Sequence, residues 1–249
     1  MILIRPFVSD TIPFDKKENV IVQEQLNRLR VRRRWIDFIS LSTLLAFVLL
    51  AALVKHKRID DWDHAISRYV QSFEQSWITD IAVWLSFIGS RDPIIVLCLI
   101  AIALQYVLLK HRTEILLLIG VIAGSSILNL LLKLAFQRMR PDIHRLIEVT
   151  GYSFPSGHSM VAFSFYGVLA YLLWRHIESG KGRIVLIVIA ILMIGSIGLS
   201  RVYLGVHYPS DIVGGYLAAS FWLALSVGQY ERFMERFRRK DAGMIRGSG

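Results

Sequence analysis

Three basic side chains and one serine–glycine segment are the features of this sequence best suited to hold a phosphate group. Lys133 and Arg140 lie seven residues apart, and Arg201 follows in a later segment. Arginine offers a planar fork of donors to phosphoryl oxygens, and lysine offers a compact charge. On a continuous helix Lys133 and Arg140 would share a face, but the proline after Arg140 favours a helix end, so Arg140 could also reach the site from a loop. Ser156 and Gly157 precede an apolar run, where a helix N-terminus would offer backbone N–H groups to an anion.

Two histidines supply the remaining chemistry. A neutral imidazole can attack phosphorus, and a second imidazole can protonate the leaving oxygen, so His158 and His207 predict a phosphoryl-transfer site. Asp211 follows His207 by four residues, which lets its carboxylate reach back and fix the imidazole tautomer. Asp211 could also simply favour the positive end of a helix dipole.

No metal or other cofactor is predicted. The only acidic run near this face contains the aspartates at positions 60, 61 and 63, and we expect them to lie in a solvated loop rather than to hold Mg²⁺.

The elements that must position these residues are predicted to be membrane spans. The chain has 249 residues, 54% of them hydrophobic, and a mean hydropathy of +0.50. Its apolar residues form long continuous runs, which favour helices that cross a bilayer. The fold class predicted is therefore an all-α, polytopic membrane protein with six transmembrane helices and short interfacial helices. The six expected spans are Trp35–Val54, Pro93–Leu109, Ile115–Phe136, Ser159–Trp174, Ile184–Leu199 and Ile212–Gly228.

We expect a single transmembrane domain with two flanking segments. Residues 1–34 are predicted to be a cytoplasmic segment with an interfacial helix, residues 35–229 the six-helix domain, and residues 230–249 a basic cytoplasmic tail. Between the first two spans, Trp62, Tyr69, Trp77 and Trp84 lie among polar residues over 55–92, which is typical of amphipathic helices lying at the interface.

The charge pattern predicts the orientation of the chain. The net charge is +10, and most of the 29 lysines and arginines fall outside the spans on one side. The positive-inside rule therefore predicts both ends in the cytoplasm and the candidate site at the extracytoplasmic face of a cell membrane. Basic flanks of this kind suit lipid headgroups, and no nucleic-acid partner is expected. The single cysteine, Cys98, excludes a disulfide framework within the chain.

Taken singly, each candidate residue has an ordinary explanation. A lysine at the end of a span can snorkel to the interface, and arginines there can anchor headgroups. The functional prediction therefore depends on the whole set, which comes from four separate spans and meets at one membrane face.

These motifs resemble the three signature motifs of the type 2 phosphatidic acid phosphatase superfamily, also called the lipid phosphate phosphatases. The matching residues are Lys133-x₆-Arg140-Pro141, Pro155-Ser156-Gly157-His158 and Ser200-Arg201-x₅-His207-x₃-Asp211. The motifs are complete and in the family's order, and the six-span layout extends the resemblance over nearly the whole chain.

The resemblance implies a metal-independent hydrolase whose partner is a membrane lipid phosphate. His207 would be the nucleophile that forms a phosphohistidine, Asp211 its orienting partner, and His158 the general acid and then base. The phosphoryl oxygens would be held by Lys133, Arg140, Ser156, Gly157 and Arg201.

The sequence leaves the substrate and the outcome open. Undecaprenyl diphosphate is favoured, with phosphatidylglycerol phosphate and phosphatidic acid as the other candidates. The alternatives are a lipid phosphotransferase that uses the same phosphohistidine and a non-catalytic membrane lipid-binding protein. A vanadium haloperoxidase is excluded, because those enzymes are soluble. The oligomeric state stays open.

Overall fold

The structure, a computed structural model, describes the backbone of residues 16–109, 112–142 and 144–247. In that part of the chain all regular elements are helices and no strand occurs, which confirms the all-α prediction. The elements are α1 (Lys16–Lys55), α2 (Asp60–Gln71), α3 (Ser76–Ile88), α4 (Arg91–Leu104) with a π-helical turn (Gln105–Leu109), α5 (Arg112–Phe136), α6 (Gly157–Trp174), α7 (Gly180–Tyr203) and α8 (Pro209–Gly247).

The membrane spans agree with the predicted number if one broken span is counted. Among the described residues, five helices are long and apolar enough to cross a bilayer: parts of α1, α5 and α8, and the whole of α6 and α7. A bent pair, Ser76–Ile88 followed by Arg91–Val107, with an angle of 53° between its halves, passes the same test when the two halves are taken together as a sixth span. The second span thus differs from the expected Pro93–Leu109, because α3, which we placed among the interfacial helices, forms its first half.

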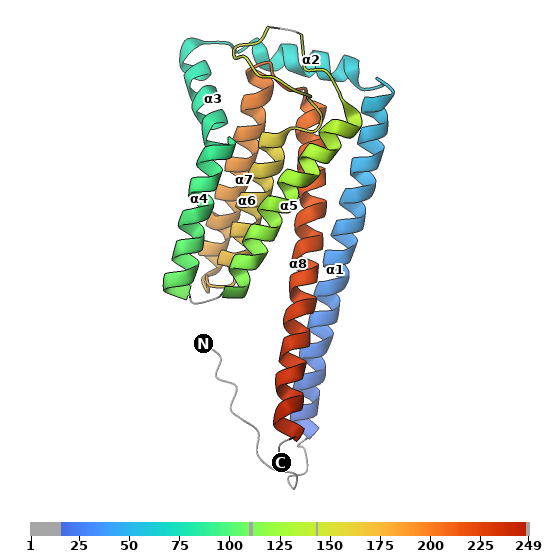
Figure 1. Ribbon diagram of the computed structural model, residues 1–249, viewed down its shortest axis with the longest axis vertical. Coiled ribbons are helices and arrows are strands. Elements are labelled where there is room, and N and C mark those ends of the chain that lie inside the picture. Colours follow the sequence, from blue (N-terminus) through green and yellow to red (C-terminus); the bar gives the residue numbers. More distant parts are fainter. Residues whose placement is uncertain (1–15, 110–111, 143, 248–249) are drawn as a thin grey trace.

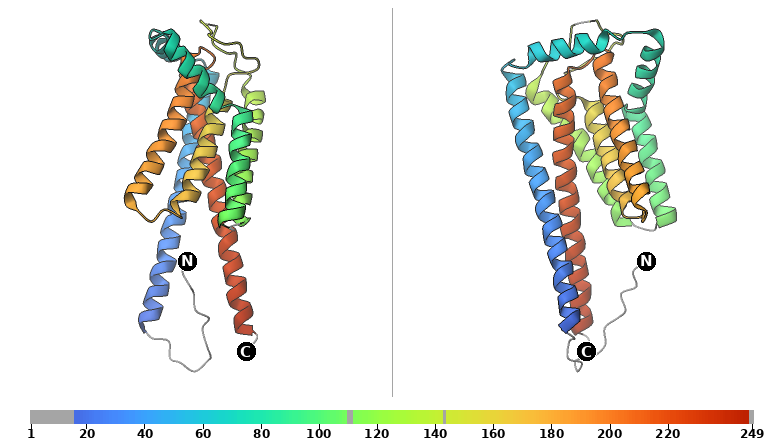
Figure 2. Two further views of the ribbon diagram at one scale, coloured as in Figure 1. Left: turned by 90° about the vertical axis from the view of Figure 1, so that its left-hand side faces the viewer. Right: turned by 180° about the vertical axis from the view of Figure 1, so that it is seen from behind.

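Helices α1 and α8 run antiparallel along most of their length and extend together beyond the rest of the bundle (Figures 1 and 2). Ion pairs join them, with Arg33 2.5 Å from Glu235 and Arg232 2.9 Å from Asp37. No glycine or proline interrupts residues 16–55, so α1 is one continuous helix. The expected boundary at residue 34 therefore falls inside this helix.

Helix α6 forms the centre of the bundle and packs against α5, α7 and α8. Its Val168 is fully buried and clusters with Leu118 and Val121 of α5. Glycines bring neighbouring helices close, because a Cβ atom at Gly124 would collide with Trp222. Small residues at such contacts are typical of helix packing in membranes.

One end of the bundle, here called the α2 end, gathers the chain segments that carry the predicted chemistry. Helices α5 and α7 end there, α6 and α8 begin there, and α2 lies across it (Figure 1). Two connections join these helices: the α5–α6 loop, residues 137–156, and the α7–α8 loop, residues 204–208. Helix α2 is amphipathic, as predicted for this segment. Its apolar Trp62 is exposed on the outside of the bundle, and its polar Asp63 is buried against the rest of the protein.

Candidate active site

The α7–α8 loop carries His207 and is locked in place by its neighbours. Gly205 has φ of +72°, and a Cβ atom there would collide with the backbone carbonyl oxygen of His144 in the α5–α6 loop. The same carbonyl accepts a hydrogen bond of 2.7 Å from Gln71 of α2, and the amide of Leu146 donates to the carbonyl of Leu204 at 3.1 Å. Only glycine fits this tight left-handed turn, which holds three segments together around the histidine.

His207 is 2% exposed and lies between a carboxylate and a guanidinium. Its Nδ1 is 3.4 Å from Oδ2 of Asp211, and its Nε2 is 3.1 Å from Nη1 of Arg140. A proton on Nδ1 facing the carboxylate leaves a lone pair on Nε2 facing the cation, so Nε2 is the nitrogen able to attack an anion held there. Burial lowers the pKa of His207 to about 4, with Arg140 and Arg201 acting in the same direction and Asp211 opposing them. The imidazole is therefore neutral at physiological pH.

Asp211 is fully buried and accepts hydrogen bonds on both oxygens. Oδ2 faces His207 and also accepts from Ser153 Oγ and from the backbone amide of Tyr208, the latter at 2.8 Å. Oδ1 accepts from Nη1 of Arg138 at 2.8 Å. Asp211 also lies in the first turn of α8, where the helix dipole stabilises an anion.

The three predicted cations converge on the same end of the bundle. Arg140 extends from the α5–α6 loop, since α5 ends at Phe136, and it donates to the carbonyls of Val206 at 2.8 Å and Gly151 at 2.9 Å. Lys133, in the last turn of α5, donates to the carbonyl of Tyr152. Carbonyl oxygens thus orient both side chains while their positive charge stays available.

Arg201 comes from the last turn of α7 and is buried. Its Nη1 donates to Ser86 of α3, so the bent second span supports the site. Its Nε has no hydrogen-bond partner among the described residues. A buried guanidinium with an unused donor is prepared for an anionic ligand.

The PSGH segment forms the N-terminus of α6, as predicted. Ser156 is the N-cap, its side chain accepts from the amide of Ser159 at 3.4 Å, and its own amide donates to the carbonyl of Asp211 at 3.0 Å. A Cβ atom at Gly157 would come within 3.1 Å of Asn129 Oδ1. The first turn of α6 is therefore pinned against α8, next to the carboxylate that faces His207.

His158 lies half-buried in the first turn of α6. Four charged or titratable groups act on it electrostatically: Arg201, His207, Arg140 and Lys133. The structure thus brings all eight predicted residues to the α2 end, and both histidines lie within electrostatic reach of one cluster of cations.

Sequence reasoning missed four residues that surround this cluster. Ser153 and Arg138 bind Asp211, and Ser210 and Asp63 bind one another at 2.5 Å on the far side of Arg138. The expected solvated loop at the aspartates is wrong for Asp63, which is in α2 and 2% exposed, because it is buried against Arg138 and α8. No spacing in the sequence distinguishes Asp63 from the neighbouring aspartates, because its burial depends on how α2 folds across the bundle onto Arg138.

The described residues contain no group of three or more His, Cys, Asp or Glu side chains placed to hold a metal ion. The positive charge near His207 and His158 comes from the side chains of lysine and arginine instead.

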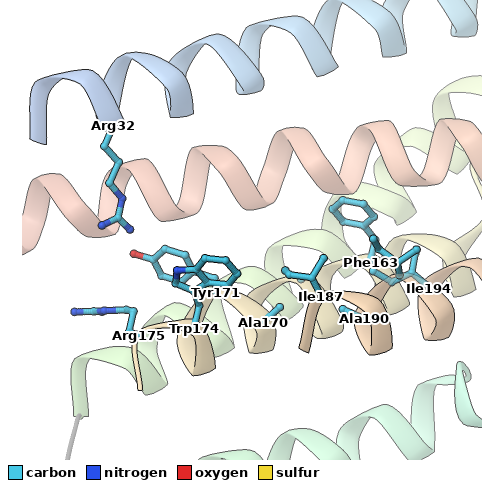
Figure 3. Close-up of a pocket in the computed structure, with 11 residues that line it drawn as sticks. Arg32, Phe163, Ala170, Tyr171, Trp174, Arg175, Ile187, Ala190 and Ile194 are labelled. Atoms are coloured by element: carbon cyan, nitrogen blue, oxygen red, sulfur yellow. The ribbon is translucent and has the colours of Figure 1, made fainter. Parts of the chain in front are cut away.

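The groove drawn in Figure 3 lies elsewhere, between α6 and α7 and toward the other end of the bundle. It encloses about 670 Å³, and its lining is mostly apolar. Its two arginines are already paired, Arg32 with Glu231 at 2.6 Å and Arg175 with Glu114 at 3.0 Å. None of the eight predicted residues lines this groove.

Known proteins with similar sequences carry the same family assignment that the three motifs predict. The profile of the PAP2 superfamily matches residues 114–235. Phosphatidylglycerophosphatase B of Bacillus subtilis (strain 168) is 32% identical over 200 residues, which cover 80% of this chain and 98% of that protein. A shorter match, 37% identical over 78 residues, covers 31% of this chain and 34% of the undecaprenyl-diphosphatase of Sulfolobus acidocaldarius.

A solved structure also matches. The crystal structure of a transmembrane PAP2 type phosphatidylglycerolphosphate phosphatase from Bacillus subtilis superposes with a TM-score of 0.72 and 31% sequence identity, over 78% of this chain and 97% of that one. The match of sequence and of helical arrangement over most of both chains confirms the resemblance that the three motifs predict. This chain belongs to the PAP2 superfamily.

Proposed function

We propose that this protein is an integral-membrane lipid phosphatase that removes a terminal phosphate from a lipid phosphate or diphosphate through a phosphohistidine on His207. The observation that carries the proposal is the position of His207, held through Nδ1 by Asp211 and facing Arg140 through Nε2. His158 and Arg201 complete the set within electrostatic reach. Such an arrangement gives a neutral nucleophile beside cations that can hold its target.

In the first step, the lone pair on Nε2 of His207 attacks phosphorus, and the bond from phosphorus to the leaving oxygen breaks. His158, in its protonated form, donates a proton to that oxygen and becomes neutral, and the oxygen leaves in a lipid alcohol or a lipid monophosphate. Asp211 stabilises the charge that develops on the imidazole of His207, as the carboxylate does in hydrolase triads.

In the second step, the neutral His158 takes a proton from water, and the resulting oxygen attacks phosphorus. The phosphorus–nitrogen bond breaks, its electron pair returns to His207, and inorganic phosphate leaves. Lys133, Arg140 and Arg201 stabilise the phosphoryl oxygens in both steps, with Ser156 and Gly157 at the helix terminus. These cations supply the charge that Mg²⁺ supplies in kinases, so the proposed reaction needs no metal.

Phosphatidylglycerol phosphate and undecaprenyl diphosphate are the two substrates to test first. The relative that matches along almost its whole length is named a phosphatidylglycerophosphatase, and a shorter match is named an undecaprenyl-diphosphatase. Both lipids place a terminal phosphate at the membrane surface and an apolar tail in the bilayer, which suits a site at the end of a helical bundle.

The test measures free phosphate released from each lipid alone by the purified protein in detergent. We expect quantitative release by the wild type, and no release by His207→Ala. His144→Ala is the matched control, since that histidine is exposed and paired with Glu74 at 2.9 Å, and it should stay active. Phosphate that appears on a second lipid, with none released from the single lipid alone, would show a transferase. Activity that survives in His207→Ala would overturn the proposed nucleophile.

We further propose that the α2 end faces outward from the cytoplasm, as the distribution of basic residues favours. Two exposed positions at opposite ends of the bundle allow a direct test: Asp142 in the α5–α6 loop and Lys181 at the start of α7. In a Cys98→Ala background, a membrane-impermeant maleimide should label Asp142→Cys in intact cells and Lys181→Cys only after lysis. The reverse pattern would refute this orientation.

A further inference from the structure

Arg138 occupies the side of Asp211 that faces away from His207. Its Nη1 donates to Asp211 Oδ1 at 2.8 Å and to Ser210 Oγ at 2.7 Å. Its Nη2 donates to Asp63 Oδ2 at 2.8 Å and to Asp60 Oδ1 at 3.3 Å, and its Cζ lies 4.3 Å from the centroid of the Tyr208 ring. Both terminal nitrogens of the guanidinium are thus engaged with other side chains, and the arginine side chain is only 13% exposed.

Asp63 fixes the other side of this arginine and reaches the start of α8 as well. Its Oδ1 accepts from the backbone amide of Ser210 at 2.9 Å, and its Oδ2 accepts from the hydroxyl of Ser210 at 2.5 Å. The backbone donor at the N-terminus of α8 is therefore satisfied by a residue from α2, far away in sequence. A carboxylate at this position also interacts favourably with the helix dipole.

Burying a carboxylate in a membrane protein is costly unless it is paired, so the burial of Asp63 requires an explanation. Its partners are Arg138 and Ser210, and Arg138 in turn binds Asp211. The four side chains His207, Asp211, Arg138 and Asp63 form a line in which a neutral imidazole is followed by negative, positive and negative groups, and the exposed edge of Arg138 also pairs with Asp60. Burial alone would lower the pKa of Arg138, but Asp211 and Asp63 raise it, so the arginine stays charged.

We propose that Arg138 and Asp63 are positioning residues that hold the Asp211 carboxylate in place and balance its charge, so that helix α2 takes part in orienting the nucleophile. The inference rests on the proposed role of His207. Neither residue touches the face of His207 that meets Arg140, so they act through Asp211. Arg138 keeps Oδ1 of Asp211 occupied, which leaves Oδ2 to face His207 Nδ1.

The proposal predicts effects of opposite sign on the protonation of His207. The charged groups around His207 are Asp211 of α8, Arg140 of the α5–α6 loop and Arg201 of α7, and His158 of α6 lies within electrostatic reach. Lys133 of α5 acts on Asp211. Removing the positive charge in Arg138→Gln leaves the carboxylates uncompensated, so the pKa of His207 should rise. Removing the negative charge in Asp63→Asn should lower it.

The experiment compares Arg138→Gln and Asp63→Asn with the wild type in lipid phosphatase assays across pH. We expect kcat to fall about 10- to 100-fold in Arg138→Gln, with KM nearly unchanged. The pH at which kcat/KM falls to half on the acid side of the profile should rise by about half a pH unit to one pH unit in Arg138→Gln, and it should fall in Asp63→Asn. In the double variant, the pH of this acid-side fall should lie close to the wild-type value. Arg183→Gln is the matched control, because Arg183 also stacks on an aromatic ring, Trp174 at 5.0 Å, at the opposite end of the bundle.

A second measurement separates this inference from the proposed function. The pKa of His207 can be followed by NMR in protein labelled at histidine, with His207→Ala used for the assignment, whether or not the protein turns over a lipid. Shifts of opposite sign without activity would support the charge line and refute the proposed function. An unmoved pKa in both variants, or shifts of the same sign, would overturn the positioning role.

The variants also separate positioning from folding. If Arg138→Gln does not fold, then Arg138→Lys and Asp63→Asn decide the question. Lysine keeps the charge but has one nitrogen, so it cannot bridge Asp211 and Asp63 as the guanidinium does. We expect a lowered kcat in Arg138→Lys, while the pH of the acid-side fall of kcat/KM stays close to the wild-type value because the charge is kept. Two results together would overturn the proposal: a wild-type kcat in Arg138→Lys, and an acid-side fall of kcat/KM at the wild-type pH in Asp63→Asn.

Discussion

Asp211→Asn is the substitution that most directly tests how His207 is oriented. The replacement keeps the shape of the side chain but turns one carboxylate oxygen into an NH₂ group. If the NH₂ group takes the place of Oδ2, it faces His207 Nδ1, Ser153 Oγ and the Tyr208 amide, and the imidazole must then keep its proton on Nε2. If the NH₂ group takes the place of Oδ1, it faces Nη1 of Arg138. Both groups are then hydrogen-bond donors, so the hydrogen bond from Arg138 is lost.

The expected loss follows from the tautomer. In hydrolases with a Ser-His-Asp triad, the same substitution lowers kcat by ~10⁴ because the imidazole adopts the wrong tautomer. The distance of 3.4 Å between Nδ1 and Oδ2 is longer than an ordinary hydrogen bond, so the loss here should be somewhat smaller. We expect kcat to fall by about 10³ to 10⁴, which corresponds to about 4 to 5.5 kcal/mol in the activation free energy.

The assay is phosphate release from a saturating lipid phosphate, with kcat and KM measured separately. The matched control is Asp142→Asn, since that aspartate is exposed in the α5–α6 loop at the same end of the bundle and should leave kcat unchanged. A thermal unfolding scan of both variants shows whether Asp211→Asn is folded when it is assayed. A folded Asp211→Asn protein with kcat within tenfold of the wild type would refute the assigned role of the carboxylate.

Three further predictions follow from the site and its loops. Because burial lowers the pKa of His207 to about 4, kcat/KM should fall below about pH 4 as the nucleophile becomes protonated; a rate that keeps climbing as the pH drops below 4 would contradict the assignment. Dialysis against EDTA should leave activity intact, and a loss that Mg²⁺ restores would reveal an essential metal. Gly205→Ala should lower the free energy of unfolding by more than the ~1 to 3 kcal/mol of backbone strain, because its Cβ also meets a carbonyl; Gly151→Ala, with φ of +81° and open space, should show the strain alone in the same thermal scan.

The positions of the predicted site residues could be derived from sequence because each borders an apolar run. The end of a span fixes the depth of Lys133 or Arg201 in the membrane, and alternating span directions then bring both to one face. The four-residue spacing of His207 and Asp211 also predicts their contact, whose observed distance is 3.4 Å. Local pattern and membrane geometry together were sufficient for these features.

The surrounding residues could not be derived in this way, because their environment depends on how distant segments fold over one another. Asp63 looks like a surface residue until α2 lies across the bundle and places it on Arg138. Arg138 itself is one of the six residues between Lys133 and Arg140 whose identity the motif leaves open, so no pattern distinguishes it. Ser86 could not be linked to Arg201 because α3 was expected at the interface and instead forms half of a bent span.

The cluster of Lys133, Arg140 and Arg201 has a consequence for the protein between turnovers. Like charges held close together repel one another, and the fold bears this cost whenever the site is empty. Any small oxyanion that fills the site relieves the repulsion and so raises the stability of the folded chain, and above the dissociation constant this gain grows with the logarithm of the oxyanion concentration. Inorganic phosphate has the same charged oxygens as the group that the site is proposed to hold. On the proposed mechanism, the phosphate released in one turnover is therefore also a ligand that stabilises the folded chain and competes with the next lipid for the same cations.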